Sequence, residues 1–300
     1  MFSPFRLREV HLRNRVAVSP MDMHNAVDDL SLHLRYGNEG DLAPVQYFPK
    51  MSSDYTAILS GKHALVTGGA RGIGEAIAKA LAANGARVSV VSRNPGNVAG
   101  QFTTAQADVT DEAQLKAAFE HCRKANGPVE ILVSNSGIAD SAPLTRTTLE
   151  LFERIIATNL TGTFLACRDA AADMLKAKWG RILNVASMAG LHGAPYVAAY
   201  CASKHGVIGF TRAIAAEFSG TGITVNAICP GYTETDMMQQ AIDKIMKFTG
   251  ASNESARQSL ADMNPEGRLA SVEEVAQASL DLICGERSGI SVVVPGGAEA

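Results

Sequence analysis

Long apolar runs, paired cysteines and concentrated charge of one sign are all missing from this 300-residue sequence. No run approaches the ~18 apolar residues that a membrane-spanning helix needs, so we expect no membrane partner. The five cysteines form no C-x-x-C pair, and their odd number argues against a disulfide framework or a zinc site; we predict no metal. A net charge of −3 with scattered basic residues argues against nucleic acid, which needs a concentrated basic face.

The first residues also lack the composition of a secretory signal. Charged side chains at Arg6, Glu9, Arg13 and Arg15 interrupt the apolar ones. We therefore expect a cytoplasmic protein with reduced cysteines. What the sequence does contain is apolar material, because 46% of its residues are hydrophobic and only 19% are charged. This composition is typical of a globular chain with a large core.

Short apolar runs alternate with helical patterns from about residue 61 onward. The predicted strands are His63–Thr67, Val88–Val91, Val129–Val133, Arg181–Ala186 and Ile223–Ile228, and the predicted helices are Gly74–Asn84, Asp111–Phe119, Leu149–Leu175 and Ala199–Phe218. The strands are continuously apolar, which is typical of a parallel sheet covered on both faces. The sequence predicts an α/β fold with a doubly wound parallel sheet, as a single domain over residues 61–300.

Residues 1–60 differ from the rest in composition. Arginine, aspartate and histidine are frequent there, and residues 41–60 contain two prolines and no strong period. We predict an N-terminal extension and linker, poorly ordered or peripheral to the domain.

A glycine-rich turn follows the first predicted strand and opens the first predicted helix, where residues 67–74 read TGGARGIG. Glycine permits a tight turn and lets the backbone approach a pyrophosphate, to which a helix N-terminus offers N–H groups. A dinucleotide fits this arrangement. The second strand ends without the acidic residue that bonds the ribose hydroxyls of NAD. Arg71 and Arg93 can instead pair with a 2′-phosphate, which favours NADP(H) over NAD(H), although Arg93 as a solvated loop residue is the alternative.

Tyr200 and Lys204 lie one turn apart on the same face of a predicted helix. Reducing a carbonyl needs a proton donor at the oxygen, and a free tyrosine with a pKa of about 10 is poorly matched to neutral pH. A nearby ammonium stabilises the phenolate and lowers that pKa. Such a pair is mostly accidental when it stands alone. Here Ser187 closes an apolar strand, at the carboxyl edge of the sheet where such folds bind ligands.

These motifs together resemble the short-chain dehydrogenase/reductase family, whose fold is the Rossmann type. The resemblance implies that Tyr200 is the general acid/base and that Ser187 polarises the substrate oxygen. It implies that Lys204 lowers the pKa of Tyr200 and binds the nicotinamide ribose, and that Asn159 holds a water of a proton relay. The implied cofactor-binding residues are Thr67, Gly68, Arg71, Gly72, Ile73, Gly74, Arg93, Asp108, Val109, Asn135, Gly137, Tyr200, Lys204, Pro230, Gly231, Thr233 and Thr235. Among them, Asp108 and Val109 meet the adenine, and residues 230–235 hold the nicotinamide carboxamide.

Two segments depart from the family pattern. Residues 134–137 read SNSG where the family usually has Asn-Asn-Ala-Gly, so we expect the turn to survive with altered hydrogen bonds. Residues 294–297 read VPGG in place of Asp-Gly-Gly, after a stretch that looks shortened. The family resemblance implies a homo-oligomer, tetramer or dimer, and this altered end predicts weakened subunit contacts.

The substrate is indicated by two further resemblances. Tyr200–Gly209 and Val225–Tyr232 are similar to 3-oxoacyl-thioester reductases, 3-hydroxybutyrate dehydrogenases and aromatic-polyketide ketoreductases. We expect hydride transfer between NADP(H) and the 3-oxo/3-hydroxy group of an acyl thioester, with acyl-CoA among the candidates and a methionine-containing lid at about 235–265. The alternatives are an NAD-dependent dehydrogenase of a 3-hydroxyacid or cyclic alcohol, and a polyketide-type ketoreductase. The complete catalytic set argues against a cofactor-sensing protein with a degenerate site.

Residues 1–40 resemble the N-terminus of old yellow enzyme-type flavin oxidoreductases. That family needs ~250 residues to close its eight-stranded barrel, so this piece cannot bind flavin in that way. We interpret it as a displaced start or a fusion remnant, with a small docking or oligomerisation arm as the alternative.

Overall fold

The computed structural model describes residues 5–7, 10–12, 45–46 and 54–295. The chain divides into two compact units between Ala43 and Pro44. In the first unit, β1 (Phe5–Leu7) and β2 (Val10–Leu12) form an antiparallel pair. The rest of residues 1–40, and with it the interpretation of this segment, lies outside the described residues.

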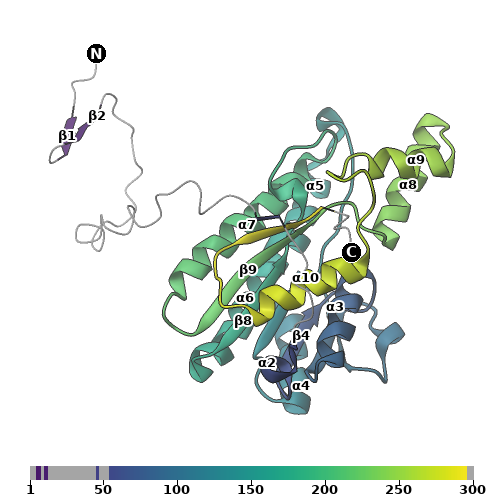
Figure 1. The fold of residues 1–300 in the computed structure, drawn as a ribbon. Coiled ribbons are helices and arrows are strands. Elements are labelled where there is room, and N and C mark those ends of the chain that lie inside the picture. The colour runs from purple at the N-terminus through teal and green to yellow at the C-terminus, as the bar shows by residue number, and fades with distance from the viewer. Residues whose placement is uncertain (1–4, 8–9, 13–44, 47–53, 296–300) are drawn as a thin grey trace. The chain divides into compact units, whose positions relative to one another are not determined.

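The second unit is built on one parallel sheet (Figure 1). Its strands lie in the order β3 (Val45–Gln46), β10 (Ser291–Val294), β9 (Ile223–Pro230), β8 (Gly180–Val185), β7 (Ile131–Ser134), β4 (His63–Thr67), β5 (Arg87–Ser92) and β6 (Thr103–Gln106). The chain winds outward from β4 to β6, then returns to β7 and winds outward the other way to β10. This confirms the doubly wound α/β prediction. All five predicted strands match within two residues at each end, and β9 runs two residues further than predicted, to Pro230.

Helices cover both faces of this sheet (Figure 1). They are α2 (Thr56–Leu59), α3 (Gly72–Ala83), α4 (Glu112–Asn126), α5 (Leu149–Ile156), α6 (Gly162–Ala177), α7 (Ala198–Glu217), α8 (Asp236–Thr249), α9 (Asn253–Ala261) and α10 (Val272–Cys284). None of those in the described part of the chain has the length and apolarity of a membrane span.

Alternate residues of each central strand enter different cores, which explains why the strands are apolar throughout. On β4, Ala64 and Val66 pack in one cluster with α3 and α10, whereas Leu65 packs in the other with α4 and α6. All three side chains are fully buried. A strand covered on both faces has no polar side, as expected for a parallel sheet.

The packed unit reaches further toward the N-terminus than Gly61, where the sequence predicts the domain to begin. Tyr55 and Leu59, at the start and end of α2, belong to the same core cluster as α3 and α10. The Tyr55 hydroxyl also donates to Asp281 on α10. The short helix α2 is therefore part of the packed domain.

The segment predicted as a lid contains two helices with a core of their own. Met238 and Ile242 of α8 pack against Ala256 and Leu260 of α9. This small cluster is separate from the two clusters that flank the sheet.

Candidate active site

The turn after β4 is fixed by hydrogen bonds from the neighbouring strand β7. Thr67 Oγ1 accepts from the N–H groups of Asn135 (3.0 Å) and Ser136 (3.2 Å). In return, Asn135 Nδ2 donates to the carbonyls of Thr67 and Gly68, both at 3.1 Å. The SNSG sequence thus supports a fully bonded turn, and Ser134 adds a hydrogen bond of its own to Thr163 at 3.1 Å.

Glycine is required at the start of α3 for two different reasons. Gly68 and Gly72 have φ of +65° and +54°, in the left-handed region that favours glycine. At Gly74 the reason is space, since a Cβ there would lie 2.5 Å from the Gly68 carbonyl oxygen. The first N–H groups of α3 have no intrahelical acceptor, and together with the helix dipole they favour an anion at this point.

A cleft of about 810 Å³ opens beyond the carboxyl ends of the central strands, where the chain reverses its winding. The predicted cofactor-binding residues that line it are Gly68, Arg71, Gly72, Ile73, Gly74, Arg93, Asp108, Val109, Asn135, Gly137 and Thr235. Thr67, Pro230, Gly231 and Thr233 do not line it, and neither does the catalytic set. Lining residues outside the predicted cofactor-binding set are Ala70, Ser92, Asn94, Gly96, Asn97, Ala107, Ser136, Ile138, Thr158 and, from the predicted lid, Asp236 and Met237. Most of these residues are next to a predicted site residue in the sequence, and that adjacency is the sequence feature that could have identified them.

The two arginines sit in different surroundings at the rim of the cleft. Arg93 is exposed at the end of β5. Arg71 is exposed too, but its Nη1 lies 3.6 Å from Asp236 Oδ2 on the first turn of α8. Across the cleft, Asp108 accepts hydrogen bonds from the Thr110 backbone (2.9 Å) and hydroxyl (2.8 Å). These bonds hold the loop after β6 in shape.

Ser187, Tyr200 and Lys204 come together at the ends of β8 and α7. A hydrogen bond from the Ser187 side chain lowers the pKa of Tyr200, and Ser187 Oγ itself accepts from the Ala189 N–H at 3.1 Å. Lys204 is 4% exposed, its Nζ donates to the Val185 carbonyl at 2.8 Å, and it lies 5.7 Å from the Tyr200 ring centre. The structure therefore assembles three of the four predicted catalytic residues around one hydroxyl pair.

Burial shifts the pKa values of Tyr200 and Lys204 in opposite directions. Burial raises the pKa of Tyr200, and the hydrogen bond from Ser187 opposes this only in part. Burial lowers the pKa of Lys204 to about 8. The sequence predicts that Lys204 lowers the tyrosine pKa, and that role stays a prediction.

Asn159 lies in a π-helical segment, Ala157–Thr161, which interrupts the predicted helix between α5 and α6. Such bulges occur often at functional sites. The buried Asn159 side chain accepts from Ile138 N–H (2.8 Å) and donates to Ile138 O (2.9 Å) and Ser203 Oγ (3.0 Å). A Cβ on Gly137 would lie 3.4 Å from Asn159 Oδ1 and 3.6 Å from Lys204 Nζ. Gly137 thus joins the cleft to the catalytic residues.

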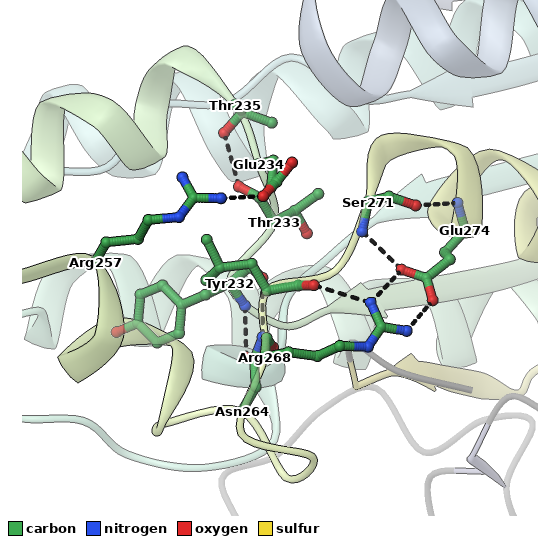
Figure 2. A network of polar contacts seen from close by, with 10 residues as sticks. Tyr232, Thr233, Glu234, Thr235, Arg257, Asn264, Arg268, Ser271 and Glu274 are labelled. Carbon is green, nitrogen blue, oxygen red and sulfur yellow. Dashed lines mark hydrogen bonds and ion pairs between the residues drawn. The ribbon is translucent and has the colours of Figure 1, made fainter. Parts of the chain in front are cut away.

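The segment after β9 is held by its own hydrogen bonds and by residues far along the chain (Figure 2). Gly231 N–H donates to Val294 O at 3.0 Å, and Thr233 Oγ1 donates to Gly231 O at 3.0 Å. Thr235 caps α8 by accepting from Met238 N–H at 3.3 Å. Asn264, which sequence reasoning missed, bonds the Tyr232 backbone from the other side. No local motif marks it, because its partners are main-chain groups.

Nowhere in the described residues do three or more histidine, cysteine, aspartate or glutamate side chains gather in a way that could hold a metal ion.

Several known proteins are similar to this chain. The family model described as short chain dehydrogenase matches residues 62–245. The 3-oxoacyl-[acyl-carrier-protein] reductase MabA of Mycobacterium tuberculosis is 41% identical over 232 residues, which cover 77% of this chain and 89% of the reductase. D-threitol dehydrogenase of Mycolicibacterium smegmatis is 36% identical over 261 residues, 83% of this chain and 96% of the dehydrogenase. The solved structure of a variant of actinorhodin polyketide ketoreductase with NADPH has a TM-score of 0.74 at 33% identity, covering 82% of this chain and 98% of that one.

Proposed function

The chain belongs to the short chain dehydrogenase family, and on that basis we propose that it transfers a hydride between NADP(H) and the 3-oxo/3-hydroxy group of an acyl thioester. It is an NAD(P)-dependent oxidoreductase that acts on CH–OH groups. The observation that carries the finer proposal is the Ser187–Tyr200 hydroxyl pair beside the buried Lys204, next to a cleft at the switch point of the sheet.

The residues of the cleft fit a phosphorylated dinucleotide. The glycine turn leaves the backbone open to a pyrophosphate at the N-terminus of α3, and Gly74 lets the helix approach the turn. Arg71 and Arg93 line the rim, where a 2′-phosphate would find two guanidinium groups and no carboxylate from β5. The NADPH in the actinorhodin ketoreductase structure supports the same choice. Bound there, the cofactor supplies or accepts the hydride.

The catalytic side chains would then manage the proton. A raised pKa keeps the Tyr200 phenol protonated at neutral pH, so that it can donate to a carbonyl oxygen that is becoming an alkoxide. Ser187, whose hydrogen bond lowers the pKa of that phenol, orients the same oxygen. Lys204, with a pKa of about 8, is largely an ammonium at neutral pH and stabilises the phenolate that remains. The water held by Asn159 in a relay stays a prediction.

The acyl-thioester substrate is supported by the MabA relative, whose name states a 3-oxoacyl-[acyl-carrier-protein] substrate. Met237, on the first turn of α8, lines the cleft and is 42% exposed, which suits an adaptable apolar contact. The D-threitol dehydrogenase relative favours the second candidate in its substrate, an alcohol, and the use of NAD is part of that proposal alone. The oligomeric state and the cytoplasmic location stay predictions.

Initial rates test the substrate and cofactor together. The initial rate of acetoacetyl-CoA reduction should be higher with NADPH than with an equal concentration of NADH. Both rates should be higher than the rate of D-threitol oxidation with NAD. Faster oxidation of D-threitol would favour the second candidate.

Tyr200→Phe tests the acid/base role. We expect a loss of about 10²- to 10⁴-fold in turnover, the usual range for general acid catalysis, with NADPH affinity retained. Tyr196→Phe is the matched control, because Tyr196 is 66% exposed on the neighbouring loop and should keep wild-type rates. Unchanged turnover in Tyr200→Phe would show that another group moves the proton.

A further inference from the structure

The Asn264 side chain makes three hydrogen bonds to main-chain groups. It lies after α9, is 3% exposed, and its side chain is directed at the main chain of Tyr232 (Figure 2). Oδ1 accepts from Tyr232 N–H at 2.8 Å, while Nδ2 donates to Tyr232 O at 2.9 Å and to Arg268 O at 2.7 Å. One amide therefore bonds both backbone groups of Tyr232, whose carbonyl also accepts from the Ala270 N–H at 2.9 Å.

Gly231 is shaped to receive this amide. Its φ is not in the left-handed region, so glycine is not required there for the backbone conformation. A Cβ at Gly231 would instead lie 3.1 Å from Asn264 Cγ and closer still to Oδ1, nearer than real Cβ atoms come. Gly231 and Asn264 are thus complementary in shape across residues distant in sequence.

The residues behind Asn264 anchor it to the core. Arg268 binds Glu274 through two contacts, of 2.5 and 3.1 Å. Glu274 Oε2 accepts from Ser271 N–H at 2.7 Å, and Ser271 Oγ accepts from Glu274 N–H at 3.1 Å, which forms a capping box at the start of α10. Helix α10 packs in the same core cluster as α3. The Tyr232 backbone is therefore tied to a rigid helix through Asn264 and Arg268.

The clamped stretch passes between the two parts of the site. At its near end, a Cβ on Gly231 would be 3.2 Å from the Sδ of Met188, which directly follows Ser187. At its far end, Thr235 lines the cleft, and its Cγ2 lies 3.3 Å from where a Cβ on Gly72 would be. A shift of the Tyr232 backbone would move the chain between the catalytic hydroxyls and the glycine turn.

We propose that Asn264 is a positioning residue that fixes the Gly231–Thr233 backbone for the nicotinamide end of the cofactor. This inference rests on the proposed function. Asn264 touches neither cofactor nor substrate and acts through the main chain of Tyr232. Its loss should therefore weaken recognition of the nicotinamide half and leave the adenine half, bound across the cleft, unchanged.

The experiment compares NADPH with 2′,5′-ADP, which contains only the adenine half, by calorimetry on the full chain. Asn264→Ala should bind NADPH about tenfold more weakly, because the Tyr232 N–H loses its partner and the Tyr232 carbonyl keeps only the Ala270 N–H, while 2′,5′-ADP binds within about twofold of wild type. An unchanged NADPH affinity, or an equal loss for both ligands, would overturn the proposal. Wild-type protein that binds neither ligand would instead refute the proposed function.

A second pair of variants tests the shape complementarity. Gly231→Ala should weaken NADPH binding about tenfold, and in the double variant with Asn264→Ala the two losses should be less than multiplicative, since the shortened side chain leaves room for the added methyl group. Fully multiplicative losses would contradict the clamp. If Asn264→Ala does not fold, Asn264→Asp keeps the volume and the acceptor for Tyr232 N–H but lacks both donors, and the same two-ligand comparison decides.

Arg257→Ala is the matched control for the clamp. Arg257 also reaches this segment, through an ion pair with Glu234, but the two side chains are 47% and 53% exposed. NADPH affinity should stay within about twofold of wild type. A tenfold loss of NADPH affinity in Arg257→Ala would show that other contacts to this segment matter as much, and would contradict a specific role for Asn264.

Discussion

The two walls of the cleft are held in place by different forces. One wall, the glycine turn at residues 67–74 with Asn135, is fixed by hydrogen bonds among groups that are buried or half-buried. The other wall is the first turn of α8. The lid to which it belongs, helices α8 and α9, is joined to its surroundings by ion pairs among exposed and half-exposed side chains. These pairs are Arg71–Asp236, Lys244–Asp140 and Arg257–Glu234. The lid wall also has a separate small core.

This difference implies different tolerances to change. A buried group left without its partner costs about 1–3 kcal/mol, whereas an exposed ion pair contributes about 0–1 kcal/mol and is screened by salt. The glycine wall is therefore preorganised for a ligand of fixed shape, such as a dinucleotide. The lid wall can adjust at little cost, which suits the side of the site that selects the substrate.

Gly74→Ala should give the largest effect, because it tests the tightest contact of the glycine wall. The added methyl group would meet the Gly68 carbonyl, which is backbone, and Asn135 Nδ2, which two hydrogen bonds hold in place. We expect a loss of about 1–3 kcal/mol in the free energy of unfolding, measured with urea, and at least tenfold weaker NADPH binding.

Gly209→Ala is the control for Gly74→Ala. Gly209 lies within α7, and a Cβ there would meet nothing within 4 Å. Alanine should stabilise the helix by about 0.4–1 kcal/mol and leave NADPH binding unchanged. Equal destabilisation by both substitutions would mean that Gly74 is needed for some reason other than this contact.

The same contrast explains how much of the molecule the sequence predicts. The glycine wall was predictable because tight turns and close helix approach restrict the residue types at Gly68, Gly72 and Gly74. The lid wall was predictable only as a segment, since exposed ion pairs restrict no residue type. Asn264 escaped prediction because it bonds main-chain groups, which any sequence provides. The strand β6 was missed because its sequence, TTAQ, is largely polar and half-buried at the sheet edge.

The lowered pKa of Lys204 could not be predicted from the sequence either, because it depends mainly on how deeply the side chain is buried. A lysine whose pKa is lowered on folding destabilises the folded state at every pH at which the folded protein carries it charged. This penalty decreases as the pH rises from the folded pKa of about 8 toward the usual value of 10.5. Its contribution to the free energy of unfolding should rise by about 1 kcal/mol between pH 8 and pH 9.

The measurement for Lys204 is the difference in unfolding free energy between wild type and Lys204→Met at the two pH values. A difference is needed because burial raises the pKa of four thiols, Cys122, Cys167, Cys229 and Cys284. Those thiols ionise more readily when unfolded, so they lower stability as the pH rises. If wild type and variant change in parallel, Lys204 does not titrate in this range.

Lys244→Gln should give the smallest effect and tests the lid wall. Lys244 on α8 pairs with Asp140, in the loop after β7, and Arg154 lies 3.5 Å from the same carboxylate. Burial alone would raise the pKa of Asp140, but the Lys244 hydrogen bond and further contacts lower it overall. With side chains 45% and 32% exposed, the pair should contribute less than about 1 kcal/mol to unfolding.

Loss of this ion pair should nevertheless change the kinetic constants of the enzyme more than its free energy of unfolding. We expect Lys244→Gln to change the substrate KM by a few fold at low salt and by less at 0.5 M salt, where the Debye length falls to about 4 Å, while the KM for NADPH stays constant. Lys247→Gln, an exposed lysine on the same helix, should change neither constant. A loss of NADPH affinity in Lys244→Gln that matches the loss in Gly74→Ala would mean that the two walls act as one rigid unit, so that substrate selection could not change without disturbing the cofactor.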